Sequence, residues 1–217
     1  MDEPTPGTPG TFGTLDASDP AQVAEYERHF YQAYAALTDN TLVRLIWDWD
    51  DAAQCLRARI PYADQVIYCL RDDQGRLATA MAVNVNPDAA LQSAGFGFIP
   101  SGAQGRGPDG RYCELLNLMA TPHHRGQART AYQAFIRDFC YSDLVARGFG
   151  TAYSTCTRRR LRSYRLFGAT VLDQTVIRGE ERYFLHWPIA DLLADGRISP
   201  PVGAAAGART PRRVARL

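Results

Sequence analysis

Apolar and polar positions along the chain form blocks that predict strands and helices in turn. Residues 113–120 are mostly apolar, which is typical of a strand buried on both faces. From residue 128 onward apolar side chains recur at helical spacing as far as Gly148, where a glycine indicates the end of a helix. A strand that enters a helix through a turn containing Gly126 points several backbone N–H groups the same way. The positive end of the helix dipole lies behind them, so this turn could hold a phosphate.

The rest of the pattern alternates strands and helices and ends in a hairpin, which predicts an α/β chain with a sheet of mixed strand direction. Asp19 and Pro20 mark the start of a helix that runs to about residue 38. A second helix is expected within residues 41–59, where WDWD (47–50) suits either a pocket rim or a half-buried element with solvated acids. Further strands are expected at residues 65–71, 77–85, 150–156, 169–177 and 181–187, with a short basic helix at 157–168.

The length of 217 residues suits one domain with a full core. Residues 1–19 are expected to be a flexible segment, 20–196 the domain, and 197–217 a loose Arg-rich tail. The insert at 86–110 is rich in Gly, Pro and Ser and leads into the strand at 113–120, so we expect it to cover part of a substrate site.

The composition indicates the class of protein and its expected cellular location. Hydrophobic content of 46% and a net charge of +1 are ordinary for a soluble globular protein and give no general attraction to nucleic acid or membrane. All 24 basic residues are Arg. The five cysteines have no paired spacing and are read as reduced core residues. No signal peptide or membrane-length apolar run is visible, so the expected location is the cytoplasm.

One stretch resembles a known family. Ala120, Pro122, His123 and His124 precede Arg125-Gly126-Gln127-Ala128-Arg129-Thr130. This order is similar to the core motif of the GCN5-related N-acetyltransferase (GNAT) superfamily, which is Val-x-Pro, two residues, then Arg/Gln-x-x-Gly-x-Gly/Ala. The two motif glycines are replaced here by Ala128 and Thr130. Glycines let a backbone approach a pyrophosphate closely, so the departure bears on phosphate binding.

A second match follows in LRSYRLFGA (161–169), which resembles the later helix of the same family, with Tyr164 four residues before Gly168. The resemblance covers roughly residues 60–190. It implies an α/β (α+β) fold whose mixed, mostly antiparallel sheet is splayed at its central strands and flanked by helices. It also implies a first strand, for which TFGTL (11–15) is a weak candidate.

The resemblance further implies binding of acetyl-coenzyme A or another acyl-coenzyme A as acyl donor. The pantetheine arm would pair with backbone of the motif strand, and the phosphates would bind the turn after it. The implied donor-binding residues are Leu118, Met119, Ala120, Arg125, Gly126, Gln127, Ala128, Arg129 and Thr130.

Glu114 is the candidate general base. It interrupts an apolar strand eleven residues before Arg125, the spacing of the catalytic Glu in the histone-acetylating branch of the family. Burial raises the pKa of a carboxyl group, which suits a base near neutral pH, acting directly or through water. The alternative is a structural Glu that pairs with an Arg or caps a backbone group.

Tyr164 is the candidate acid that protonates the leaving thiolate, a role implied by the family match. The alternative is a buried Tyr that only packs its helix. His123 and His124 are adjacent on a turn and have no third ligand at suitable spacing, so no metal is expected. Nothing flanking Cys113 would activate it as a nucleophile.

An arginine run carries the densest charge, and its members are Arg158, Arg159, Arg160, Arg162 and Arg165. It could be a solvated helix face, or a dock for the phosphates of coenzyme A or for an acidic acyl carrier protein.

The function expected from these observations is transfer of an acyl group, acetyl by default, to an amine of a small molecule or peptide. One alternative is an enzyme similar to the N-acyl amino acid synthases that uses a longer acyl chain from coenzyme A or a carrier protein. Another is a catalytically inactive binding module of the same fold. Nucleic acid and membranes are not expected partners.

Overall fold

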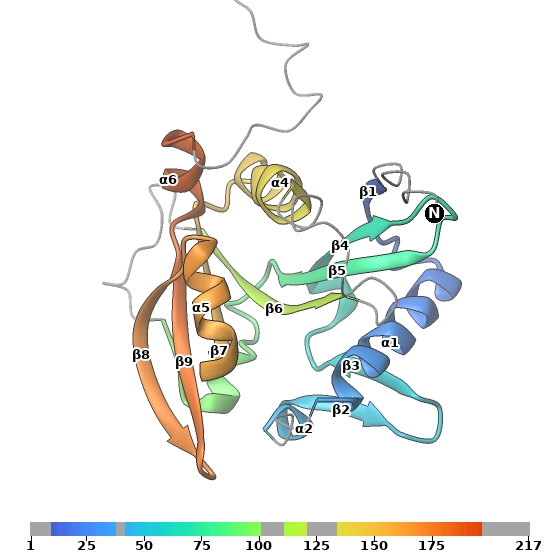
Figure 1. Cartoon of the computed structure of the whole chain (residues 1–217), viewed down its shortest axis with the longest axis horizontal. Coiled ribbons are helices and arrows are strands. Elements are labelled where there is room, and N and C mark those ends of the chain that lie inside the picture. The colour runs from blue at the N-terminus through green and yellow to red at the C-terminus, as the bar shows by residue number, and fades with distance from the viewer. Residues whose placement is uncertain (1–9, 38–41, 101–110, 121–133, 197–217) are drawn as a thin grey trace, which may run out of the picture.

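The centre of the molecule is a seven-stranded sheet with the order β1-β4-β5-β6-β7-β9-β8 (Figure 1). The computed structural model describes residues 10–37, 42–100, 111–120 and 134–196. Neighbouring strands are antiparallel except β6 and β7, which run parallel. The strands are β1 Thr11–Thr14, β4 Gln65–Arg71, β5 Leu77–Asn84, β6 Tyr112–Ala120, β7 Thr151–Thr157, β8 Thr170–Ile177 and β9 Glu180–Trp187. The expected mixed, mostly antiparallel sheet is confirmed.

Helical segments cover this sheet. They are α1 Pro20–Ala35, α2 Val43–Ile46, η1 Tyr62–Asp64, η2 Ser93–Phe96, the π-type segment η4 Ala134–Tyr141, α4 Ser142–Ala146, α5 Arg158–Leu166 and α6 Ile189–Ala194. The Asp19 carboxylate caps α1 by accepting the backbone N–H of Ala21 at 2.9 Å. Gly148 follows α4 with a φ of +87°, the conformation of the expected glycine stop.

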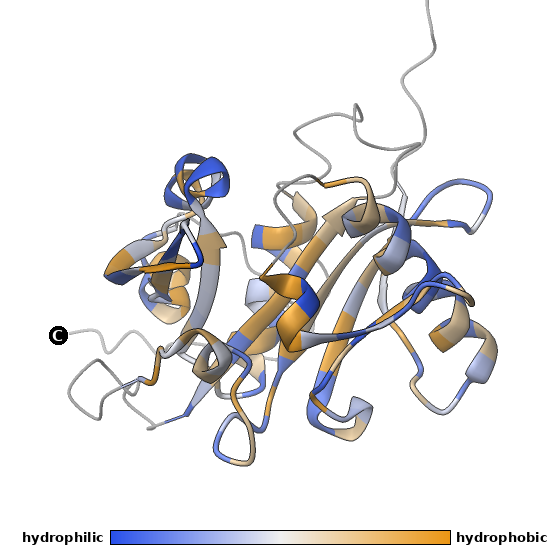
Figure 2. Ribbon diagram, turned by 90° about the horizontal axis from the view of Figure 1, so that it is seen from below, coloured by the Kyte–Doolittle hydropathy of each residue, from blue (hydrophilic) through white to orange (hydrophobic). Residues whose placement is uncertain are grey.

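The two faces of the sheet pack against different elements. On one face Tyr26 and Phe30 of α1 and Trp47 pack on Ala80, among other side chains. The other face is covered by η4, α4 and α6 in a larger cluster that includes Phe135, with α5 packed beside it. Figure 2 shows the resulting distribution, with hydrophobic residues concentrated on the central strands. A sheet buried on both faces explains why β5 is buried along its whole length.

Residues 41–59 do not form the second helix that we expected. After the short α2 the chain makes a separate hairpin of β2 (Trp47–Asp50) and β3 (Cys55–Ala58). Side chains of the WDWD segment point alternately to the interior and to solvent, which is the two-residue period of a strand. This alternation, and not helical propensity, determines the local structure.

The sheet begins with β1 in the TFGTL segment (11–15), the candidate for the first strand, whereas the domain was expected to start at residue 20. β1 pairs with β4 in the register Thr11 with Arg71, so residues 11–14 belong to the folded unit.

A parting of two neighbouring strands at the centre of the sheet positions the site. β6 and β7 pair only where Tyr112–Glu114 lie beside Thr151–Tyr153. Beyond Glu114 the two strands separate, while β6 keeps its pairing with β5 as far as Ala120. The register of β5 and β6 shifts once between Ala82 and Val83, leaving Leu116 as an extra residue in a bulge of β6. The splay that the family resemblance implies is present.

Candidate functional site

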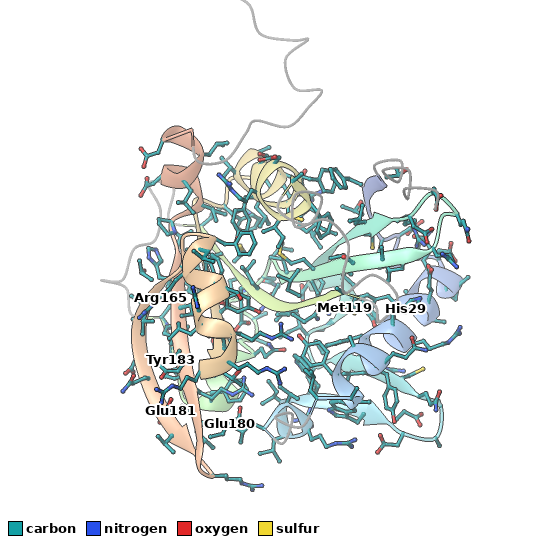
Figure 3. The ribbon with its side chains drawn as sticks, viewed as in Figure 1. His29, Met119, Arg165, Glu180, Glu181 and Tyr183 are labelled. Atoms are coloured by element: carbon teal, nitrogen blue, oxygen red, sulfur yellow. The ribbon has the colours of Figure 1, made fainter. Side chains whose placement is uncertain are left out.

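A cavity of about 870 Å³ fills the gap between β6 and β7. Its walls come from both sides of the gap, with residues 115–120 of β6 on one side and residues 154–157 of β7 on the other. Figure 3 shows the two sides, with Met119 toward α1 and Arg165 on α5 across the opening. A volume of this size is typical of a small-molecule site.

Leu118, Met119 and Ala120, the strand residues expected to bind the donor arm, all line this cavity. Their strand edge is not paired with β7, so backbone groups there can pair with an extended ligand. The Tyr34 hydroxyl lies 3.5 Å from the Leu118 carbonyl oxygen and also lines the cavity. The expected phosphate-binding residues Arg125, Gly126, Gln127, Ala128, Arg129 and Thr130, together with His123 and His124, lie outside the described residues.

Glu114 lies on β6 and is almost completely buried, at 1% exposure. Its carboxylate accepts the backbone N–H of Gln92 at 2.8 Å and that of Ser93 at 2.7 Å, and Asn84 Nδ2 lies 3.4 Å away. Burial raises the pKa of Glu114, although these hydrogen bonds favour its charged form. Glu114 caps backbone groups, as one of its two interpretations states, and it is not among the residues that line the cavity.

Tyr164 lies on α5 and lines the cavity together with the β6 edge. Its ring packs on Trp187 at 5.5 Å between centroids, and the Trp187 indole N–H donates to the Ser154 hydroxyl at 2.8 Å.

Gly168 follows the end of α5 with a φ of +97°, and an added Cβ there would lie 2.7 Å from a Leu192 methyl. Glycine is therefore required at the point where the α5 turn packs on α6.

Among the polar residues of the cavity wall that we had not singled out are Gln92 and Arg182. Gln92 comes from the insert, and its side-chain N–H donates to the Leu116 carbonyl at 2.8 Å while its oxygen accepts the indole N–H of Trp47. The insert thus contributes to the cavity wall, where Phe96 joins Gln92. The second missed residue, Arg182 of β9, looks like an ordinary strand charge in the sequence and is buried at 5% exposure.

The arginine run lies on α5, and all five of its members are exposed. Arg159, Arg160 and Arg162 line the cavity, whereas Arg158 pairs with Glu181 at 3.5 Å. With Arg182 they are the charged residues of the cavity wall, and no Asp or Glu is found among the lining residues within the described parts of the chain.

The described residues also bear on metal binding, cysteine reactivity and membrane insertion. Within the ranges that the structure describes, no group of three or more His, Cys, Asp or Glu residues could hold a metal ion. The five cysteines are free thiols, and burial raises the pKa of Cys69 to about 12 and the pKa of Cys113 further. None of the helices described is both long and apolar enough to cross a membrane.

No protein-family model matches the sequence, and no curated protein matches it. Solved structures do match. TofI, in a ternary complex with an inhibitor and MTA, is 16% identical with a TM-score of 0.60, over 88% of this chain and 98% of that chain. A structure described as histone acetyltransferase HPA2 and related acetyltransferase from Corynebacterium glutamicum is 14% identical, with a TM-score of 0.52 over 83% of this chain and 97% of that one.

A variant of the spermidine N-acetyltransferase SpeG from Vibrio cholerae is 11% identical, with a TM-score of 0.52 over 87% of this chain and 98% of that chain. At these identities the similarity is one of fold, and it spans nearly the full length of each structure. The fold of this chain is therefore that of the GNAT superfamily, as its two sequence motifs predict.

Proposed function

We propose that this protein transfers an acyl group from the thioester of an acyl-coenzyme A to an amine. The observation that carries the proposal is the unpaired β6 edge at Leu118–Ala120, which lies in the same cavity as Tyr164. An extended pantetheine arm can pair with such an edge and lie between the strands. Acyl-coenzyme A is the substrate here, and acetyl is the default acyl group.

The reaction needs one proton removed and one supplied. The amine nitrogen attacks the thioester carbonyl carbon, the C–S bond breaks, and the sulfur leaves as a thiolate. In this proposal the Tyr164 hydroxyl gives its proton to that thiolate, and its place on the cavity wall supports the role. An exposed arginine run beside the cavity suits the phosphates of the donor.

Glu114 is the proposed base. Its burial favours a proton-accepting role near neutral pH, because the pKa of the carboxyl group is raised. Since Glu114 does not line the cavity, the proton would reach it through water. The Glu114 carboxylate also accepts hydrogen bonds from two backbone N–H groups and so holds residues 92–93 in place. An experiment therefore has to separate its role as a base from this structural role.

A longer acyl chain is the second candidate, and one feature of the cavity favours it. Apolar side chains from the face of the sheet that η4 covers also line the cavity, namely Leu70, Met81, Leu115, Ile136 and Tyr141. An acetyl group would leave such a wall without a partner, whereas an acyl chain would bury it. The chain could arrive on coenzyme A or on a carrier protein, whose acidic surface would suit the arginine run.

The test is a donor comparison. Thermal shift is measured with acetyl-coenzyme A, a long-chain acyl-coenzyme A and an acylated carrier protein, followed by thiol release with a panel of amines. Stabilisation by a donor together with amine-dependent thiol release is the expected result. Donor binding without release from any amine would favour the inactive binding module, and no response to all three donors would refute the proposal.

A further inference from the structure

The cavity reaches both faces of the sheet, and different polar side chains line it on each face. On β7 and β9, Ser154 and Trp187 face α5, where Trp187 packs on Tyr164. Thr157 and Arg182 are direct cross-strand partners and belong to the opposite face by the alternation of the strands. If the donor occupies the Tyr164 side, the acceptor amine approaches from the face that carries Arg182.

Arg182 is a buried cation whose hydrogen bonds are incomplete. Its Nη2 lies 2.7 Å from Glu180 Oε1, and its guanidinium carbon lies 4.7 Å from the centre of the Phe96 ring. Its Nε is buried and has no hydrogen-bond partner among the residues that the structure describes. A buried donor on a charged group is costly to leave unpaired, so the position is suited to a ligand that accepts from it.

Thr157 supplies a second unpaired polar atom at the same place. Its Oγ1 is buried and has no hydrogen-bond partner within the described parts of the chain, and both Thr157 and Arg182 line the cavity. Thr157 directly precedes α5, yet its side chain does not cap the helix. The first-turn N–H groups of α5 begin there, and the dipole of the helix favours an anion at that end.

The shape and charge of these groups select the ligand. A guanidinium is a planar fork, and Glu180 contacts it through Nη2, so Nε remains for a second acceptor. A carboxylate has two oxygens in one plane, which suits one N–H donor and one hydroxyl donor side by side. The other charged residues lining the cavity, in the ranges that the structure describes, are arginines, which also favour an anionic ligand.

We infer that the acceptor is an amine that also carries a carboxylate, such as a free amino acid, and that Arg182 Nε and Thr157 Oγ1 bind this carboxylate. The inference rests on the proposed acyl transfer and names the class of acceptor for it. Arg182 and Thr157 are binding residues in this scheme and take no part in the proton transfers.

The experiment compares amines that differ only in the carboxylate. Each amino acid of a panel is offered beside its amide and its decarboxylated amine, with the donor that stabilises the protein most. We expect kcat/KM to be at least about tenfold higher for an amino acid than for its amide. Arg182→Gln should abolish that preference while leaving the KM for the acyl donor unchanged. Equal use of amino acids and amides by the wild-type protein would overturn the inference and leave the proposed acyl transfer intact.

Two further variants protect the test against a folding defect in Arg182→Gln. Thr157→Val keeps the shape of the side chain and should lower the preference about threefold. Glu180→Gln removes the negative charge beside Nη2 and should increase the preference, and a decrease would contradict the assignment. Arg76→Gln is the matched surface control, because Arg76 has a side chain 62% exposed, lies outside the arginine run and does not line the cavity.

A binding measurement separates failure of this inference from failure of the proposed reaction. Calorimetric titration of an N-acetyl amino acid and of its amide, each with coenzyme A present, needs no turnover. Selective binding of the carboxylate form, lost in Arg182→Gln, would support the site even if no amine is acylated. If neither form binds, or if both bind equally, the carboxylate site is refuted whatever the outcome of the donor comparison.

Discussion

The Glu114 carboxylate accepts the backbone N–H of Gln92 at 2.8 Å, which connects the motif strand to the segment that forms part of the cavity wall. The side chain of Gln92 then returns to β6 by donating to the Leu116 carbonyl. A single buried carboxylate thus holds the insert against the strand that borders the gap. Its replacement will affect both the site and the fold.

We expect Glu114→Gln to lower turnover at least about tenfold, because a neutral amide cannot accept the proton of the amine. The amide also cannot accept from both backbone N–H groups with equal geometry, so the melting temperature should fall as well. Steady-state kinetics across pH and thermal unfolding measure the two effects separately.

Gln92→Ala is the matched control for that variant. It removes the contact with Leu116 while keeping the backbone N–H that Glu114 accepts. A pH profile that is unchanged in Glu114→Gln, with KM effects similar to those of Gln92→Ala, would assign Glu114 to positioning and remove it as the base.

We expect Tyr164→Phe to lower kcat at least about tenfold while the protein stays folded, because the ring keeps its packing on Trp187 and the proton donor is lost. Tyr183→Phe is the control, since the Tyr183 hydroxyl donates to Glu181 at 2.9 Å and Tyr183 does not line the cavity. Equal rates for Tyr164→Phe and the wild-type protein would leave Tyr164 as a packing residue only.

We expect Gly168→Ala to destabilise the protein by about 3 kcal/mol, since it combines a strained φ of +97° with a Cβ placed 2.7 Å from Leu192. Gly179→Ala has a similar φ of +82°, and no atom of the described residues lies within 4 Å of the added Cβ, so it should cost only about 1 kcal/mol. Chemical denaturation of the two variants gives the difference, and equal costs would show that the contact with Leu192 can relax.

His186 should make the protein less stable in mild acid. Burial lowers the pKa of His186, with Asp191 acting weakly in the other direction. The unfolded chain therefore binds more protons than the folded chain between the lowered pKa and the ordinary value of 6.5, and the free energy of unfolding rises with pH across that window. His186→Asn should flatten this dependence in denaturation curves measured between about pH 5 and 7.5. An unchanged slope would mean that His186 does not titrate differently on folding.

The sequence by itself determined most of the elements and the order in which they come. Apolar periodicity located β4, β5 and β6, and the Asp19-Pro20 start and the Gly148 stop marked helix ends, because these signals are local to the backbone. The WDWD segment was misjudged, because an alternating stretch of 4 residues is too short to exclude a helix until its partner β3 is known.

The separation of β6 from β7, the exclusion of Glu114 from the cavity wall and the burial of Arg182 were decided only by the tertiary structure. Each depends on partners that are distant in the sequence. A strand edge is open or closed according to its neighbour, and the surroundings of a charge are set by whichever segments pack around it. Such long-range pairings leave no periodic trace in the residues themselves.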